Sequence, residues 1–353
     1  MELDKRQIKK ILVINLGGIG DFLLSTPALR ALSVAFEQAQ IYLLLHNRVK
    51  ELAQRLKYVR KVYTFNNTEP LFFALPNFIN LIKLRMAGID LAINMRTIVS
   101  EKSALKIKTL FDTINPRMKA GRNTAGRGNF FDISITEEEV VQNYTMGYDV
   151  QLVEKLGAKV LDRKIDFLID EKERRKVNNI LEEKGIRDKN FLIGIHPGGR
   201  PSHRWPWQNF VGLIEKLTEI FNAKFVITGD KQEKELGKLI IRNSKVGVLN
   251  LCGQLSIFEL GALIERCNLY ISNDTGPAHI AAILQTPLVT IFGPGYVSGF
   301  NPVNISEKTQ IVYKKVACAP CNKFSCSNLE CLKIISTSEV LEAVLRLFQH
   351  KEK

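Results

Sequence analysis

Two glycine-rich turns place an acidic residue where a strand is expected to pass into a helix. The apolar run 11–15 is followed by G-G-I-G-D at 17–21, and the apolar run 269–272 is followed by N-D-T-G-P at 273–277. Such turns expose backbone N–H groups and the positive end of a helix dipole, which suits a phosphate or another anion. Two of them, half a chain apart, predict two α/β domains facing one cleft.

Asp21 falls in the first turn of the helix expected after the first strand. A carboxylate there could serve ligand chemistry or could simply complement the helix dipole, and local spacing does not separate these two interpretations. A dinucleotide site is disfavoured, because Leu23 stands where the third Gly of G-x-G-x-x-G belongs. The second strand also ends in His46 and Asn47, with no carboxylate for a ribose, so a nicotinamide oxidoreductase is the weaker alternative.

A third polar turn follows the strand expected at 192–196. Its small residues allow close backbone approach, while Arg200, His203 and Arg204 offer cationic donors suited to a diphosphate. Trp205 and Trp207, the only tryptophans, are expected to anchor the helix that follows.

Further along, T-G-D-K-Q-E at 228–233 could bind a ribose. The same residues also fit a capped helix start, with Asp230 near the N-cap and Glu233 three residues later.

The second opening turn favours a helix start beside a bound anion. Pro277 fits the first helical position, so Thr275 or Gly276 is expected near the cap. His279 in the first turn is more often structural than catalytic. Asp274 would need to bind a hydroxyl or orient the loop.

Apolar runs alternate with segments of helical period through most of the chain, which is typical of a parallel sheet wrapped by helices. The expected strands are 11–15, 41–45, 62–65, 89–94, 192–196, 225–228, 269–272 and 288–292. The expected helices include 23–36, 210–221, 233–242, 257–265 and 278–284. Residues 115–135 look like an irregular loop, and the charged segment 162–173 places a domain boundary near residue 165.

Composition agrees with two domains in 353 residues. No uncharged apolar stretch is long enough to span a membrane, and the N-terminus lacks the apolar core of a signal peptide, so a cytoplasmic protein is expected. The net charge of +14 is concentrated in residues 1–165, where 25 Lys/Arg against 16 Asp/Glu leave +9.

Residues 96–127 hold eight basic residues against two acidic ones. They could form an ordinary solvated face, or a surface for a phosphorylated substrate, an anionic lipid headgroup or nucleic acid. Nucleic acid is disfavoured because aromatic residues that would stack on bases are nearly absent there.

Four cysteines, Cys318, Cys321, Cys326 and Cys331, form a C-x2-C-x4-C-x4-C cluster. One local loop with this spacing could hold a structural zinc in a tetrahedral thiolate site. Free thiols without metal are the alternative, since disulfides are rare in the cytosol.

Taken together, the motifs resemble glycosyltransferase family 9, the heptosyltransferases that build the inner core of lipopolysaccharide. The matching segments are G-G-I-G-D-F-L-L-S-T-P-A-L-R at 17–30, H-P-G-G with R-W-P at 196–206, G-D-K-Q-E at 229–233 and S-N-D-T-G-P-A-H-I-A-A at 272–282. The resemblance implies an α/β protein of GT-B architecture, two Rossmann-like doubly wound domains facing a central cleft. Residues 1–165 would bind the acceptor, 166–336 the nucleotide sugar, and a C-terminal helix within 337–353 would pack back on the first domain.

The resemblance also implies roles for single residues. Asp21 matches the catalytic carboxylate, which would take the proton from the acceptor hydroxyl during an inverting displacement. Asp274 matches the acidic residue that contacts the donor sugar, and Glu233 matches the nucleotide-ribose carboxylate. The backbone of Thr275 and Gly276 matches the donors to the diphosphate.

One position departs from the family pattern K-R-W-P, because His203 stands where Lys is usual. A neutral His would compensate the charge of departing ADP poorly at pH 7, so Arg204 is assigned that role. The donor site is expected to include His196, Gly198, Arg200, His203, Arg204, Glu233, Asp274, Thr275, Gly276 and His279. The acceptor site is expected to include Gly18, Arg96, Arg117, Arg122 and Arg127. No metal is expected to be required for catalysis.

The leading hypothesis is therefore transfer of heptose from ADP-heptose to an anionic lipopolysaccharide-core acceptor by a monomer, peripheral to the inner membrane, with no nucleic-acid partner. Another nucleotide sugar used for a different cell-surface glycan, and a non-catalytic nucleotide-sugar-binding protein, are the alternatives. Charge reversal at Arg117, Arg122 and Arg127 is expected to weaken acceptor binding and leave donor binding alone.

Overall fold

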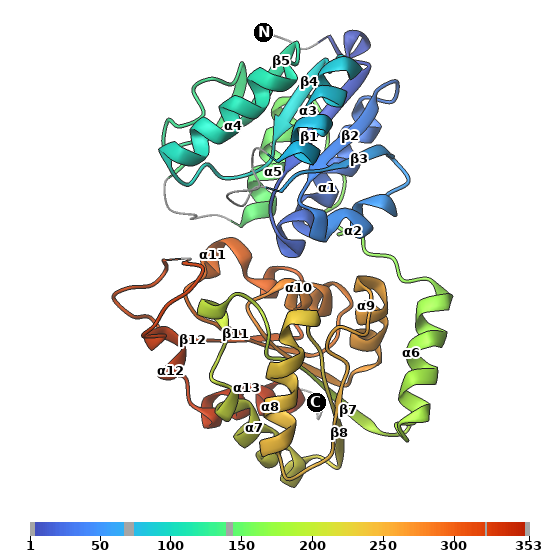
Figure 1. The fold of residues 1–353 in the computed structure, drawn as a ribbon, viewed down its shortest axis with the longest axis vertical. Helices are drawn as coiled ribbons and strands as arrows, with labels where there is room; N and C mark the ends of the chain where they lie inside the picture. Colours follow the sequence, from blue (N-terminus) through green and yellow to red (C-terminus); the bar gives the residue numbers. More distant parts are fainter. Residues whose placement is uncertain (1–3, 67–73, 139–143, 322, 350–353) are drawn as a thin grey trace. The chain divides into compact units, whose positions relative to one another are not determined.

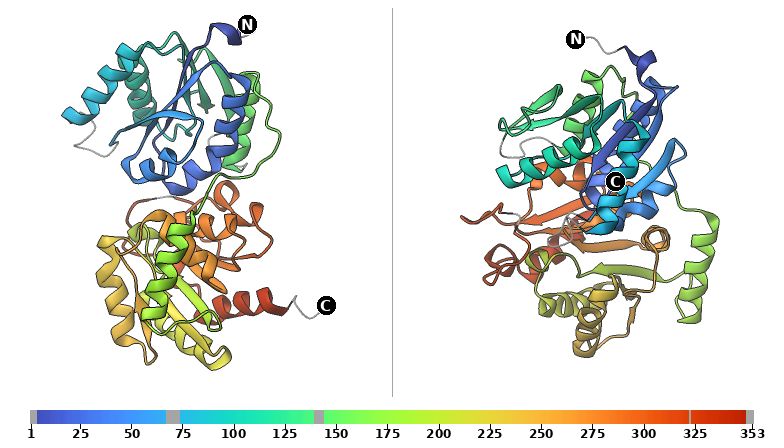
Figure 2. Two further views of the ribbon diagram at one scale, coloured as in Figure 1. Left: turned by 90° about the vertical axis from the view of Figure 1, so that its right-hand side faces the viewer. Right: turned by 45° about the horizontal axis from the view of Figure 1, so that its top comes forward.

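The computed structural model describes residues 4–66, 74–138, 144–321 and 323–349. The chain divides into two compact units, Met1–Asp166 and Phe167–Lys353. Each unit is built on one parallel six-stranded sheet with helices on both faces (Figures 1 and 2).

The sheet of the first unit has the strand order β3-β2-β1-β4-β5-β6. Its strands are β1 (Lys10–Asn15), β2 (Gln40–Leu45), β3 (Val59–Thr64), β4 (Leu91–Asn94), β5 (Met118–Thr124) and β6 (Ile133–Glu137). Its helices are α1 (Ile19–Ala35), α2 (Lys50–Gln54), α3 (Leu75–Ala87), α4 (Glu101–Ile114) and α5 (Thr145–Lys155). Helix α1 contacts α5 and helix α3 contacts α4, as the two faces of a doubly wound sheet require.

The strand order reverses between β1 and β4, which are neighbours in the sheet. The chain leaves these two strands toward opposite faces, so an open crevice is expected outside their carboxyl ends, the usual ligand position in such sheets. β4 is buried throughout, and β1 and β2 are buried after their first residues, as expected for central strands covered on both faces.

The second unit repeats the design with the strand order β12-β11-β10-β7-β8-β9. Its strands are β7 (Phe191–His196), β8 (Ala223–Ile227), β9 (Val248–Asn250), β10 (Leu269–Asn273), β11 (Leu288–Phe292) and β12 (Thr309–Tyr313). Its helices are α6 (Glu171–Glu183), α7 (Trp207–Ile220), α8 (Lys234–Asn243), α9 (Ile257–Arg266), α10 (Gly276–Ile283), α11 (Val297–Phe300), α12 (Glu330–Lys333) and α13 (Thr337–Gln349). The reversal here lies between β7 and β10.

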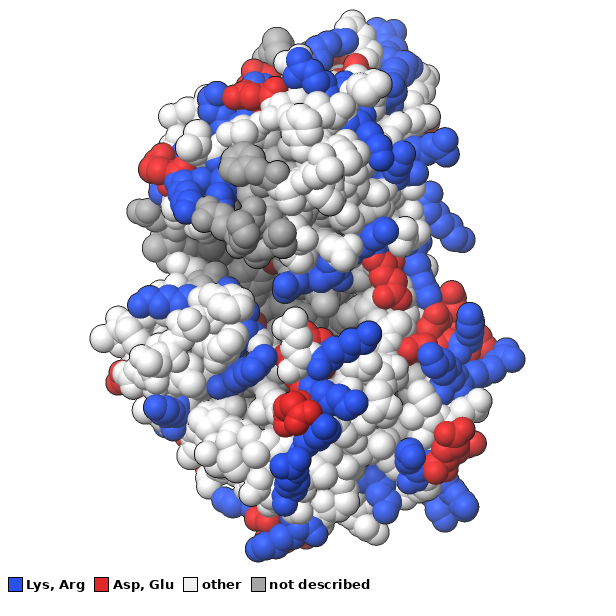
Figure 3. All heavy atoms as spheres, in the orientation of Figure 1, with Lys and Arg blue, Asp and Glu red and all other residues white. Residues whose placement is uncertain are grey.

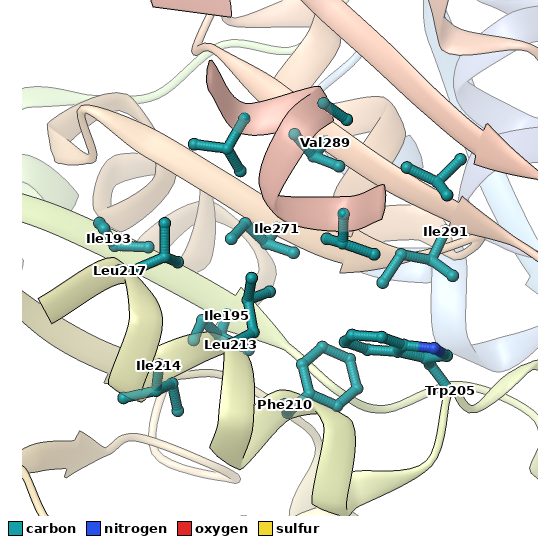
Figure 4. Close-up of a cluster of buried hydrophobic side chains, with 14 of the residues drawn as sticks. Ile193, Ile195, Trp205, Phe210, Leu213, Ile214, Leu217, Ile271, Val289 and Ile291 are labelled. Carbon is teal, nitrogen blue, oxygen red and sulfur yellow. The ribbon is translucent and has the colours of Figure 1, made fainter. Parts of the chain in front are cut away.

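The core of the second unit lies between its sheet and α7 (Figure 4). Trp205 is buried at the edge of this core, with its ring at a steep angle to Phe210 and centroids 5.0 Å apart. Its indole N–H donates to the carbonyl of Ile335 at 3.0 Å. The prediction that Trp205 anchors the following helix is confirmed.

One prediction about the fold is wrong. Residues 115–135 are not an irregular loop, because β5 and the start of β6 lie within them. Helix α13 packs within the second unit, where it contacts α7, β11 and β12, and Val340, Ala343 and Val344 are buried in that core. Its predicted packing on the first domain stays a prediction. Helices α7 and α8 follow β7 and β8, which lie in the other half of the sheet. Helix α13 covers β11 and β12 and lies beside α7. Residues 350–353 lie outside the described residues.

Among the described residues, no helix combines the length and apolar character needed to cross a bilayer.

Candidate active site

The turn after β1 holds Asp21 by both carboxylate oxygens. The Gly18 N–H donates to Asp21 Oδ2 at 2.7 Å, which closes the N-terminal cap of α1. Arg96, from the loop after β4, donates to Oδ1. A Cβ on Gly17 would lie 2.6 Å from both the Cβ and Oδ2 of Asp21, so only glycine allows this close approach. Asp21 therefore both caps the helix and lies at the switch point beside a cation.

The strand end itself supports this turn. Asn15, the last residue of β1, is buried, and its side-chain oxygen accepts from the Gly17 N–H at 3.2 Å. Its amide donates to Ser25 Oγ at 2.6 Å, which ties the turn to the second turn of α1. The side chain of Asp21 keeps 16% of its surface exposed, so a substrate hydroxyl can still reach the carboxylate.

Arg122 does not lie on the surface that the sequence predicted for it. It is 1% exposed and donates to Asp149 Oδ1 at 2.5 Å and to Glu137 Oε1 at 3.3 Å, two carboxylates that are also buried. Burial raises the pKa of Asp149, and the nearby Arg122 charge opposes that rise. Arg122 is thus an internal ion-pairing residue, and the acceptor-binding role predicted for it is wrong.

This buried network holds the loop that carries Arg96. Thr97 Oγ1 donates to Glu137 Oε1 at 2.7 Å, and Thr124 Oγ1 donates to Glu137 Oε2 at 2.5 Å. The Ile98 N–H donates to Thr124 Oγ1 at 3.0 Å. Neither Glu137 nor Thr124 was predicted, because their partners are distant in sequence.

Arg127 and Arg117, which were also predicted to bind the acceptor, lie at opposite edges of the first sheet. Arg127 lies after β5, at the carboxyl edge of the sheet, where its Nε donates to the Ile98 carbonyl at 2.7 Å. Arg117 directly precedes β5 and so lies at the opposite, amino edge, beside Gln7. It cannot share a site with Asp21, so the triple charge reversal no longer tests acceptor binding. Figure 3 shows Lys and Arg spread over the visible face of each unit rather than gathered in one patch.

In the second unit, Glu233 holds two loops at the carboxyl edge. Oε1 accepts from the Gly199 N–H at 2.5 Å, and Oε2 accepts from the Asp230 N–H at 2.8 Å. A Cβ on Gly198 would overlap the Glu233 carboxylate. Arg204 adds a longer contact, 3.5 Å from Nη2 to Oε1, and its Nε donates to the Gly199 carbonyl. The predicted capped start is confirmed, with Asp230 as the cap.

His203 is buried and serves as an acceptor for a cation. Its Nε2 lies 3.0 Å from Arg200 Nη2, and its Nδ1 lies 2.9 Å from Ser202 Oγ. Burial, together with the charge of Arg200, lowers the pKa of His203 to about 3. Since Arg200 can only donate, neutral His203 orients Arg200.

The turn after β10 starts a helix as predicted, with Thr275 as the N-cap of α10. Pro277 is the second helical residue, one position later than predicted, because α10 begins at Gly276. Asp274, Thr275 and Gly276 are half-buried. A Cβ on Gly295 would overlap Asp274 Oδ2, so Gly295 makes room for that carboxylate. Gly295 was not predicted, although its G-P-G context after β11 marks another turn at the same edge.

Asn273 is a further residue whose role was not predicted from the sequence. It is fully buried, and its amide donates to the carbonyls of Pro197 at 2.9 Å and Gly198 at 3.0 Å. Its side-chain oxygen accepts from the Trp205 N–H at 3.2 Å. It therefore fixes the loop of Arg200 and His203 against the end of β10.

Two predicted donor ligands are mainly structural in their contacts. His196 is buried, with Nδ1 3.2 Å from Thr228 Oγ1, and burial lowers its pKa. His279 is buried on α10, with its ring edge-on to Phe300.

The described residues include no group of three or more His, Cys, Asp or Glu side chains arranged to hold a metal. Cys331 is buried, whereas Cys318 and Cys326 are exposed. The zinc hypothesis is not tested by this arrangement and stays a prediction, to be checked by metal analysis of protein purified without chelator.

Both units thus carry polar turns at the carboxyl edge of a parallel sheet, around the switch point. This is the design of an α/β protein with two doubly wound domains, in which ligands bind outside the carboxyl ends of the strands.

The comparisons with known proteins agree. The family model for glycosyltransferase family 9 (heptosyltransferase) matches residues 81–332, more than half of the chain. The protein belongs to this family and is a glycosyltransferase. The chain is 22% identical to lipooligosaccharide heptosyltransferase 2 of Campylobacter jejuni over 346 residues, covering 94% of this chain and 96% of that one. It is 26% identical to lipopolysaccharide heptosyltransferase 3 of Escherichia coli over 281 residues, covering 78% and 80%.

Solved structures share the fold. The E. coli ADP-heptose lipopolysaccharide heptosyltransferase II superposes with a TM-score of 0.71 at 21% identity, covering 98% of this chain and all of that one. A family 9 glycosyltransferase of Veillonella parvula gives a TM-score of 0.77 at 20% identity, covering 99% of both chains.

Proposed function

We propose that this enzyme transfers heptose from ADP-heptose to an inner-core acceptor of lipopolysaccharide, with inversion and with Asp21 as general base. The names of the relatives support heptose and the lipopolysaccharide acceptor. The observation that carries the chemistry is Asp21 itself, a partly exposed carboxylate fixed at the switch point by Gly18 and Arg96.

A carboxylate offers about four lone-pair sites, and the contacts of Asp21 with Gly18 and Arg96 leave capacity for a substrate hydroxyl. The acceptor oxygen attacks the anomeric carbon while its proton passes to Asp21. The bond from that carbon to the phosphate oxygen breaks in the same step, and ADP departs with the electron pair. A single displacement of this kind inverts the anomeric configuration.

The donor is assigned to the second unit. The N–H groups at the start of α10, behind Thr275 and Gly276, suit the diphosphate, as the resemblance implies. Glu233 is assigned to the ribose and Asp274 to the sugar. The cation beside the departing ADP is assigned to Arg200 together with Arg204, since neutral His203 supplies no charge but orients Arg200.

The acceptor of such an enzyme is a lipid-linked, anionic glycan, so the protein is proposed to work as a peripheral protein at the cytoplasmic face of the inner membrane. Arg96 and Arg127, both at the carboxyl edge of the first sheet, are the basic residues assigned to that acceptor.

The test is the Asp21→Asn variant, assayed with ADP-heptose and a lipopolysaccharide-core acceptor, with ADP binding measured by calorimetry. We expect turnover to fall at least about 100-fold, as for loss of a general base, while ADP affinity stays unchanged. Asp112→Asn, an exposed carboxylate on α4, is the matched control. Retained turnover in Asp21→Asn would overturn the assignment.

Donor identity is tested separately by thermal stabilisation of the wild-type protein with ADP-, GDP- and UDP-sugars. A preference for a base other than adenine would favour the alternative, a different nucleotide sugar and glycan.

A further inference from the structure

Helix α3 carries a second apolar face that no part of the described chain covers. Its inner face, with Leu81 and Leu84, is buried against the sheet. On the outside, Leu75, Phe78, Ile79 and Met86 are 70%, 54%, 41% and 82% exposed. These four are among fourteen exposed large hydrophobic residues in the whole described chain, so they are concentrated on this one helix.

The four residues form a single stripe. Their spacing, i, i+3, i+4 and i+11, places them on one side of an α-helix, with half-buried Ile82 between them at i+7. They project from the convex surface of a helix, which suits insertion among lipid headgroups. We call this stripe the outer α3 face.

The charges on helix α3 itself are all basic. The helix contains no Asp or Glu, and it carries the exposed Lys83 and Arg85. The neighbouring helix α4 adds exposed Leu105, at 66%, and has a basic excess, with three lysines against Glu101 and Asp112. An apolar stripe flanked by basic residues is complementary to a membrane surface that contains anionic lipids.

The outer α3 face begins at the edge of the sheet where Asp21 lies. Asn77 exchanges two hydrogen bonds with the backbone of Asn66, at 2.9 and 2.8 Å, just after β3. Asn80 donates to the Thr64 carbonyl at 2.8 Å. Because β3 and β1 run parallel in one sheet, the first turns of α3 share the carboxyl edge with the turn of Asp21.

We propose that the outer α3 face docks the enzyme on an anionic lipid bilayer, with α3 lying in the interface. This inference rests on the proposed function in one respect, because a lipid-linked acceptor explains why a membrane contact and Asp21 share an edge. A glycan at Asp21 would then have its lipid end directed toward the membrane in which α3 lies.

The experiment is sedimentation of the full-length protein with vesicles of phosphatidylcholine alone or of an equimolar mixture with phosphatidylglycerol. We expect binding to the mixed vesicles only, weakened at least about tenfold in Phe78→Ser/Met86→Ser and in Lys83→Glu/Arg85→Glu. The matched control is Val34→Ser/Leu161→Ser, two residues of the same unit with 57% and 77% exposure. The control should bind vesicles as the wild type does.

Turnover on a water-soluble, lipid-free core oligosaccharide separates this inference from the proposed function. Phe78→Ser/Met86→Ser should keep that turnover and lose vesicle binding. Vesicle binding that is unchanged in this variant would overturn the docking surface, whatever the enzyme transfers. A wild-type dimer in sedimentation velocity that this variant dissociates would overturn it too, because a second copy would then be the occupant.

Discussion

Replacing Arg122 by Met should strongly destabilise the first unit, although the residue lies in a stretch that looks like a polar loop in the sequence. In the wild type, Arg122 donates to Asp149 Oδ1, and Asp149 Oδ2 has no hydrogen-bond partner among the described residues. The Arg122→Met variant would leave Asp149 and Glu137 as buried carboxylates without their ion-pair partner. Breaking a buried ion pair in this way costs about 3–5 kcal/mol.

The assay must separate the two units. Trp205 and Trp207 both lie in the second unit, so tryptophan fluorescence reports that unit and provides an internal reference. Hydrogen exchange of peptides from β5 and β6, followed against urea, reports the first unit. With a urea dependence of about 1–3 kcal/mol per molar, the midpoint of the first unit should fall by at least about 1 M.

The destabilisation should also depend on pH. Burial raises the pKa of Asp149 in the folded protein, and loss of Arg122 removes an opposing charge. A folded carboxyl with a raised pKa binds more protons than the unfolded one, so stability falls as pH rises through that pKa. The effect of Arg122→Met should therefore be larger at pH 8 than at pH 5.

The control is Arg117→Met, an exposed arginine just outside β5, for which about 0–1 kcal/mol is expected. A second check is Arg122→Met/Asp149→Leu, which also removes the buried carboxylate that Arg122→Met leaves unpaired. This double variant should be more stable than Arg122→Met alone. If Arg122→Met unfolds within about 1 kcal/mol of the control, the buried network does not stabilise this unit.

Three further outcomes are expected. Gly17→Ala should lower turnover at least about tenfold by displacing the carboxylate of the general base, whereas Gly147→Ala, where a Cβ meets nothing within 4 Å, should not; equal turnover would contradict this. Gly198→Ala should weaken ADP binding in calorimetry at least about tenfold, because its Cβ would overlap the Glu233 carboxylate. The control Gly247→Ala, where a Cβ meets nothing within 4 Å, should bind ADP normally. Equal ADP affinity of the two variants would remove the donor assignment of the Gly198 loop. His203 has a folded pKa of about 3, below its unfolded value, so the second unit should lose stability as pH falls below about 6.5. Tryptophan-monitored urea unfolding at pH 8 and pH 5 should show a smaller loss for His203→Gln, and an equal loss would count against a buried neutral imidazole.

The parts of the fold that sequence predicted are those stabilised by local pattern. The apolar runs of β1, β7 and β10 are buried on both faces, so their composition alone identifies them. The turns that follow contain Gly, Asp and Pro at positions where a helix start requires them.

β5 was missed for a physical reason. Its sequence M-K-A-G-R-N-T has only one buried apolar side chain, Ala120, and its buried polar residues Arg122 and Thr124 donate to Asp149 and Glu137. Glu137 lies in β6, 13 residues after Thr124, and Asp149 lies in α5, 27 residues after Arg122. A single-sequence pattern cannot show that a charge is paired inside the protein, so a buried network looks like a loop.

The surface that α13 covers in the second unit was not predicted. The family resemblance implied the helix, but an apolar stripe does not specify which surface it covers. Only the sheet order shows that β11 and β12 have an uncovered face that α13 can fill.

The ion pair between Arg96 and Asp21 should couple acceptor recognition to turnover. Arg96 donates to Asp21 Oδ1, an oxygen that could otherwise accept the substrate hydroxyl, so a turn of Arg96 toward another anion frees that oxygen. An anionic acceptor supplies that anion, whereas a neutral acceptor leaves the pair intact. We therefore expect acceptors without their anionic groups to lower kcat, and not only to raise KM.

The Arg96→Met variant checks this coupling, because in it kcat should no longer depend on the acceptor charge. A neutral acceptor that changes only KM in the wild type would show that Arg96 contributes uniform binding and does not control the base. A kcat difference that persists in Arg96→Met would place the coupling elsewhere, for example at Arg127, which holds the same loop through the Ile98 carbonyl.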